Sequence, residues 1–214
     1  MPRWGRDILI LTVIVGSVVG FYFLRQGFDA PANNSNTSAF SSERQTADRA
    51  ARSQDWLTAA ENFKVLTERD PYNSYAWYSL GDCKWMQSNP IQSESRRERM
   101  ASEPNQAQID ELQRQLREIG LAAIEDFKKA MESGRHRLMA GQYIAAIHVA
   151  LDEIDEACEM LGKCLDDGLS IREIWRAPQF AAIRNDPRFR QLAERNRPSS
   201  QRFPTPATSD GGRK

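Results

Sequence analysis

The chain contains few of the residues that carry out catalysis or hold metals. It has two histidines and three cysteines in 214 residues, and no Cys-x2-Cys pair supplies zinc-ligand spacing. It also lacks a glycine-rich phosphate loop, because its Gly-Gly pair lies near the C-terminus and no loop motif surrounds it. A nucleophile, a base and an orienting group have few candidates here. The sequence therefore predicts a protein that is not an enzyme and binds no metal or cofactor.

Net charge and a disulfide framework are missing too. The 29 basic residues equal the 29 acidic ones in number, so the total charge does not favour nucleic acid as a partner. Cys83, Cys158 and Cys164 form an odd set, and each falls in a helical pattern, where a lone thiol behaves as a small apolar group. One disulfide or a redox role for these thiols stays open as the alternative.

One long uncharged apolar run is present. Residues 8–24 form 17 such residues, just enough for a helix that crosses the hydrocarbon layer. Trp4 and Tyr22 lie near its ends, where amphipathic rings suit the membrane interface. A signal peptide would have a shorter core and an early small-x-small cleavage site, and a buried soluble helix is rarely apolar all round. We interpret residues 8–24 as a transmembrane signal-anchor helix. A secreted soluble protein, formed by cleavage, is the alternative.

Flanking charge predicts the orientation of this anchor. Arg3, Arg6 and the amino terminus precede the run, and only Arg25 follows closely. The positive-inside rule then places residues 1–7 in the cytoplasm and the rest of the chain on the far side, which is periplasmic or extracytoplasmic in a bacterium.

Two polar segments show no periodicity. Residues 25–42 are rich in Asn, Ser and Ala, and we interpret them as a flexible linker. Residues 198–214 are rich in Ser, Pro and Gly and predict a disordered tail.

Small and large residues alternate at helical spacing between residues 43 and 168. The pattern is clearest as Trp-x2-Ala-x3-Phe followed by a proline, and then as Trp-x2-Leu-Gly. A small-x3-large pair recurs twice further along the chain. The residues that we expect to pack in this pattern are Trp56, Ala59, Phe63, Pro71, Trp77, Leu80, Gly81, Ala123, Phe127, Ala130, Ala157 and Leu161.

This pattern resembles the tetratricopeptide repeat, a helix–turn–helix unit of about 34 residues. Such units stack on one another, and the stack exposes a groove that usually binds another protein. The resemblance implies an all-α fold, a short solenoid of about three helix–turn–helix units over residues 43–168. It also implies a non-catalytic scaffold for protein–protein interaction, although it does not name the partner.

The second unit departs from the family. Residues 88–118 form an insert of about 30 residues relative to a regular repeat. Ile109, Leu112 and Leu116 within it follow helical spacing that continues into Phe127. We therefore expect one long helix over residues 106–133. It is either an arm that forms a homodimer or a lid against the groove.

Residues 169–197 resemble the short helices that close many bacterial arrays of this family. Pro178-x-Phe180 and Pro187-x-Phe189 begin two similar elements, and Trp175 is expected to help cover the last apolar face. Arginines outnumber acidic residues in this part of the chain. A solvated surface is one interpretation, and contact with anionic lipid or an acidic partner is the other.

The first helices of the units carry the candidate partner-binding residues. One branch of the family grips a carboxylate there, but Asp48 and Asp82 stand where that branch has asparagine, and they would repel it. The candidates for an aromatic, mildly acidic face are Tyr78, Asp82, Trp85, Tyr143 and His148. Packing within the stack is their alternative role. An accessory factor in envelope or cytochrome biogenesis, with redox-active cysteines, is the alternative function.

Overall fold

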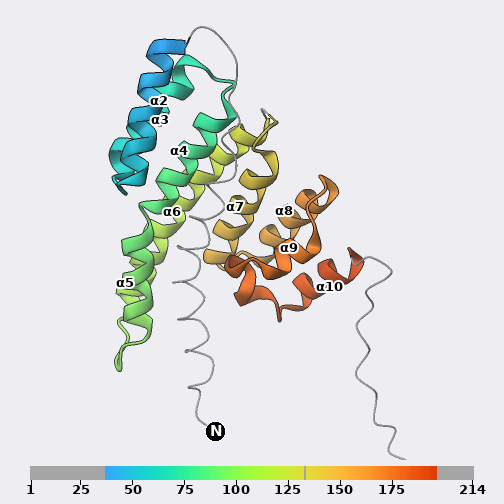
Figure 1. The fold of residues 1–214 in the computed structure, drawn as a ribbon. Coiled ribbons are helices and arrows are strands. Elements are labelled where there is room, and N and C mark those ends of the chain that lie inside the picture. The colour runs from blue at the N-terminus through green and yellow to red at the C-terminus, as the bar shows by residue number, and fades with distance from the viewer. Residues whose placement is uncertain (1–36, 133, 197–214) are drawn as a thin grey trace, which may run out of the picture.

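The computed structural model describes residues 37–132 and 134–196, and every regular element in these ranges is a helix (Figure 1). The predicted all-α fold is thus confirmed for this part of the chain. In chain order the elements are α2 (Thr37–Arg52), α3 (Trp56–Arg69), α4 (Ser74–Met86), α5 (Asn89–Arg99), α6 (Gln106–Glu132), α7 (Arg137–Ala150), α8 (Ile154–Asp166), α9 (Ile171–Arg176), the 3-10 helix η2 (Pro178–Ile183) and α10 (Pro187–Arg195).

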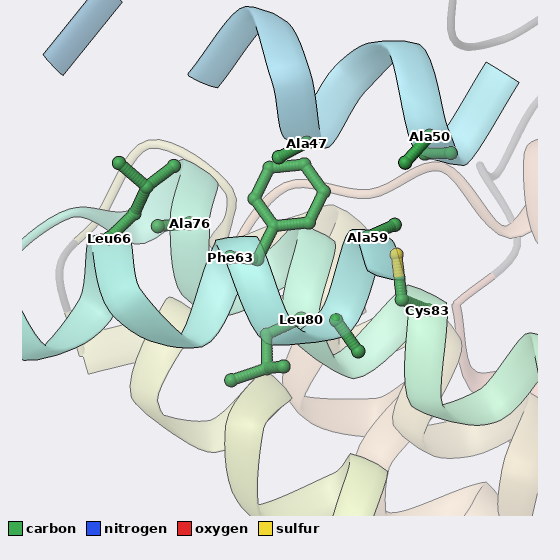
Figure 2. Close-up of a cluster of buried hydrophobic side chains, with 10 residues drawn as sticks. Ala47, Ala50, Ala59, Phe63, Leu66, Ala76, Leu80 and Cys83 are labelled. Atoms are coloured by element: carbon green, nitrogen blue, oxygen red, sulfur yellow. The ribbon is translucent and has the colours of Figure 1, made fainter. Parts of the chain in front are cut away.

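Helices α2 and α3 form the first helical hairpin. Ala47 of α2 lies over the ring of Phe63 of α3, and both side chains are fully buried (Figure 2). The small side chain lets the two helices approach closely. Helix α3 begins at Trp56, because the Asp55 carboxylate accepts a hydrogen bond from the backbone N–H of Thr58 at 3.2 Å.

Helix α4 packs on α3 and also on the second half of α6. Gly81 marks the closest approach of α4 to α6. A Cβ atom at Gly81 would lie 3.1 Å from the carbonyl oxygen of Ala123 and 3.2 Å from the Phe127 ring. Ala123 and Phe127 are themselves fully buried. The second half of α6 therefore supplies the helix that we expected to pair with α4.

Helix α5 and the first half of α6 form a hairpin that extends beyond the rest of the stack (Figure 1). We call residues 89–118 the arm. The predicted long helix is confirmed as α6, and the insert before it contains a second helix, α5, that we did not predict from the sequence. Helix α5 has few apolar residues and no clear apolar stripe. Its helical conformation is stabilised by packing against α6.

Helices α7 and α8 form the last hairpin before the cap. Ala157 and Leu161 of α8 are fully buried, as the sequence predicts. Gly141 of α7 lies directly on α8, where an added Cβ atom would be 2.5 Å from Cys164 Sγ. Gly168 follows the end of α8 with φ of +101°, a left-handed conformation that glycine adopts without strain.

Helices α9, η2 and α10 cover the end of the stack. Phe180 and Phe189 are fully buried there, and Asp186 caps α10 by accepting a hydrogen bond from the N–H of Arg188 at 2.9 Å. Trp175 covers the face only in part. Its ring stacks on the buried Phe189 and so helps to cover this face, as expected, while 40% of the residue stays exposed.

The predicted linker is too long at its C-terminal end. Helix α2 begins at Thr37, so residues 37–42 are helical instead of irregular. The docking of Ala47, Ala50 and Ala51 onto the stack fixes this helix, and its first turns continue from the docked part. The predictions for residues 1–36 and 198–214 lie outside the described residues. Among the described helices, none is both long and apolar enough to cross a membrane.

Candidate functional site

The first helices of the three pairs, α2, α4 and α7, are joined by polar and aromatic contacts. Between α2 and α4, the Tyr75 hydroxyl donates a hydrogen bond to Asp48 Oδ1 at 2.5 Å. The guanidinium of Arg44 lies 4.1 Å from the centre of the Tyr75 ring, a cation–π contact. Burial, followed by the bond to Asp48, raises the pKa of Tyr75. This tyrosine is therefore a neutral hydrogen-bond donor that ties the first unit to the second.

His136, just before α7, makes the corresponding junction between the second and third units. Its Nδ1 lies 2.9 Å from Ser74 Oγ at the start of α4. Its ring stacks on Tyr78 at 5.5 Å and tilts against Tyr75 at 5.8 Å. Burial first, then the positive charge of Arg135 and Arg44, lowers the pKa of His136. The neutral imidazole is thus favoured at this junction.

Tyr78 and Tyr143, two predicted partner-binding residues, come together in the core between α4, α6 and α7. Their ring centres are 5.4 Å apart, and Phe127 contacts both rings. Tyr78 is 9% and Tyr143 7% exposed. Asp82, a third candidate, is 6% exposed on α4. These three residues contribute to packing, and a binding role for them stays a prediction.

Trp85 and His148, the other two predicted partner-binding residues, lie half-buried where the arm leaves the stack. Trp85 would be 3.5 Å from a Cβ atom at Gly120, so it packs where α6 passes the third unit. His148 Nδ1 lies 2.7 Å from Glu153 Oε2. Glu153 also accepts a hydrogen bond from Arg117 of the arm. Trp85 and His148 therefore both lie near the base of the arm.

A polar depression of about 370 Å³ lies along α2. Its lining includes Gln45, Asp48, Arg49 and Arg52. Asp48 in this lining accepts the hydrogen bond from Tyr75, so the depression lies beside the layer that α2, α4 and α7 form. Arg49 is exposed in it. Among the described residues, this places polar and positively charged side chains beside the junction of the first and second units.

The three cysteines are present as thiols. Cys83 and Cys164 are buried, and Cys158 is half-buried. Burial, helped by the charge of Asp167, raises the pKa of Cys164 to about 11, and burial also raises the pKa of Cys158. The thiolate is the reactive form of cysteine. The two thiols thus resist ionisation near neutral pH, which does not favour the redox alternative.

Residues 41–132 and 134–196, whose side chains the structure describes, contain no group of three or more His, Cys, Asp or Glu side chains placed to hold a metal ion. The sequence did not single out Arg44, Tyr75 or His136. Their contacts join residues far apart in the chain, and no spacing rule reports such pairs. A tyrosine and a serine one turn before Tyr78 were the available signal, but a tyrosine on a helix is usually a packing residue.

No protein-family model, no curated protein and no solved structure matches this chain.

Proposed function

We propose that this chain is a non-catalytic scaffold of the tetratricopeptide type that holds a partner protein. The observation that carries the proposal is the repeated packing of three successive helix pairs, α2–α3, α4–α6 and α7–α8. In each pair a small-x3-large sequence of the second helix is fully buried: Ala59 and Phe63, Ala123 and Phe127, Ala157 and Leu161.

The register of the pairs supports this proposal further. Ala47 precedes Phe63 by the same number of residues as Ala145 precedes Leu161, and both alanines are fully buried. Gly81, which contacts Phe127, occupies the same place in the middle pair once the arm is set aside. One packing rule, a small residue of the first helix against a large residue of the second, thus recurs in all three units.

The arm gives the scaffold a feature that a regular repeat lacks. We propose that it sets which partner the scaffold accepts. Arg117 contacts Glu153, and Glu153 contacts His148 of α7, so the base of the arm lies against the third unit. Its apolar residues Ile109, Leu112 and Leu116 are buried. A homodimer through this helix, which was one of the two roles that the sequence left open, would therefore have to use the polar outer surface of the arm.

The proposal includes an anchor at residues 8–24 and a repeat domain on the far side of the membrane. The uncharged run and the arginines before it support this topology. A secreted soluble form stays the alternative, and N-terminal sequencing of the mature chain distinguishes the two.

Crosslinking in intact membranes, followed by purification of the full chain, tests the proposed function. We expect a protein partner whose yield falls at least about tenfold, a free-energy loss of about 1.4 kcal/mol, when Arg49→Glu reverses the charge beside the polar depression on α2. Lys64→Glu on α3 is the matched control, because its side chain is 70% exposed on the second helix of the same pair. Equal capture by wild type and both variants would contradict binding at the layer of first helices.

A further inference from the structure

Helix α9 presents two arginines and a tryptophan on its outward side. Ile174 is fully buried in the cap core, so the opposite side of this helix faces away from the stack. Arg172, Trp175 and Arg176 lie on that opposite side, because residues three and four apart are neighbours on a helix. All three are exposed. We call these three residues the α9 face.

Trp175 is held in place at the surface. Its ring stacks on Phe189 with the ring centres 5.7 Å apart and an angle of 17° between the ring planes. Phe189 is fully buried, so the tryptophan rests on the rigid core of the cap, while 40% of it stays in contact with solvent. A fixed, half-exposed indole ring with a polar N–H suits a boundary between apolar and aqueous surroundings.

The positive charge beside Trp175 is not offset within the cap. Arg172 and Arg176 form no ion pair with any residue that the structure describes. Arg188 of α10 differs, because it pairs with Asp155 at 3.1 Å and with Asp186. The acidic residue next to Arg172 in the sequence, Glu173, uses its carboxylate to accept a hydrogen bond from the backbone N–H of Ser170 in a capping box. The α9 face therefore carries two guanidinium groups without an ion pair among the described residues, and both can contact an external anion.

We propose that the α9 face rests on the anionic headgroups of the bilayer that holds the chain. Two exposed arginines complement lipid phosphates, and tryptophan favours the membrane interface. The proposal depends on the anchor at residues 8–24 that is part of the proposed function. Residues 25–36, between that run and α2, reach at most about 40 Å when fully extended, so the domain works close to the bilayer surface.

Fluorescence quenching of Trp175 by brominated lipid tests the proposal with the full chain in lipid vesicles. The measurement uses a Trp4→Phe background, because Trp4 borders the predicted anchor. One set of vesicles contains brominated phosphatidylglycerol and the other brominated phosphatidylcholine. The contribution of Trp175 is the quenching lost when Trp175→Phe is added. We expect quenching in the anionic vesicles and its loss in 1 M salt, where the Debye length falls to about 3 Å.

Arg172→Gln with Arg176→Gln should abolish the quenching of Trp175. The matched control removes two exposed arginines of the arm, Arg97→Gln with Arg99→Gln, and should leave it unchanged. Equal quenching in neutral and anionic vesicles, or none in either, would overturn the proposal. If an acidic protein bound the α9 face and kept Trp175 from the brominated lipid, that protein would be the ligand instead of the bilayer. If alkaline carbonate extracted the full chain from membranes, residues 8–24 would not be a transmembrane anchor, and this part of the proposed function would be wrong. If the chain resisted extraction but Trp175 was not quenched, only the proposal for the α9 face would be wrong.

Discussion

At the scale of single residues, small side chains decide how closely the helices approach. Gly141 and Gly81 leave no room for a Cβ atom, since one at Gly141 would be 2.5 Å from Cys164 Sγ and one at Gly81 would be 3.1 Å from a backbone oxygen. Gly162, on α8, has ordinary space, with Leu192 at 3.8 Å from its added Cβ. A Cβ atom at Gly141 would therefore force Cys164 to move and one at Gly81 would push on α6, whereas one at Gly162 would fit.

Gly141→Ala should destabilise the protein by about 1–2 kcal/mol. Overpacking costs about 1–3 kcal/mol and outweighs the gain of about 1 kcal/mol in helix propensity. Urea unfolding measures the change. Adding Cys164→Ala should restore part of the loss, because it removes the sulfur that the new methyl group meets. Gly162→Ala is the control and should stabilise by up to about 1 kcal/mol. A stabilised Gly141→Ala variant would show that α7 and α8 separate without cost.

Acidification should destabilise the protein through His136. Burial and neighbouring arginines lower the pKa of His136 in the folded state, below its ordinary value of 6.5. The unfolded chain then binds more protons as the pH falls, so the free energy of unfolding decreases below about pH 6.5. Urea unfolding between pH 7.5 and pH 5 measures this slope, and His136→Gln should reduce it. The same slope in both proteins would exclude His136 as the origin.

At the scale of elements, helix boundaries were predictable where a chemical signal marks them. The Asp55 and Asp186 side chains accept backbone hydrogen bonds at the starts of α3 and α10. Gly168 takes the left-handed conformation after the end of α8. Helix α5 had only a weak signal, Pro90 in its first turn. No side chain caps its start, and Ile91 is one of its few apolar residues. It is a helix because α6 offers it a surface.

Leu112→Ala should loosen the arm and leave the rest of the stack intact. Leu112 is 6% exposed on the side of α6 that faces inward, and replacing a buried leucine by alanine costs about 2–5 kcal/mol. We expect amide hydrogen exchange in α5 to accelerate at least about tenfold while α8 is unchanged. Gln113→Ala, at the exposed neighbouring position, is the control.

The same variants distinguish the arm from a dimer interface. If Leu112→Ala changed the sedimentation of the chain and left the exchange of α5 unaltered, then the apolar stripe would bind a second copy instead of α5. We expect the reverse, since α5 and α6 pack against each other within one chain.

At the scale of the whole molecule, each helix pair is stabilised by the buried contacts that it shares with the next pair. Three buried clusters follow one another, and helices α4 and α7 each contribute to two of them. Tyr78 and Tyr143 connect α4 to α7, and the Tyr75–Asp48 bond connects α4 to α2. A protein built in this way should lose structure from its ends first.

Phe189→Ala should open the C-terminal end before the N-terminal one. Truncating a fully buried phenylalanine costs about 3–5 kcal/mol. Hydrogen exchange should accelerate most in α8 and α10, less in α6, and least in α2 and α3. Arg195→Ala, an exposed change on the same helix, is the control. Uniform acceleration along the chain would show that the array unfolds as a single unit.

The helices that carry the candidate residues were predictable, and the contacts of these residues were not. The sequence placed Tyr78 and Tyr143 on the first helices, and the structure brings them into contact. It did not reveal that both are buried, since exposure depends on what neighbouring helices cover. It also gave no sign of the junction at His136, because Ser74 and Tyr78 reach it only after α4 and α7 are placed side by side.

The sequence by itself determined the helical fold, the repeated small–large pattern and the long helix with its apolar stripe, because these depend on spacing along one helix. Only the tertiary structure decided that the stripe is covered by α5, that Tyr78 and Tyr143 are buried and that Trp175 stays at the surface. Those outcomes depend on contacts between segments far apart in the chain. Local periodicity says which side of a helix is apolar, and not which neighbour covers it.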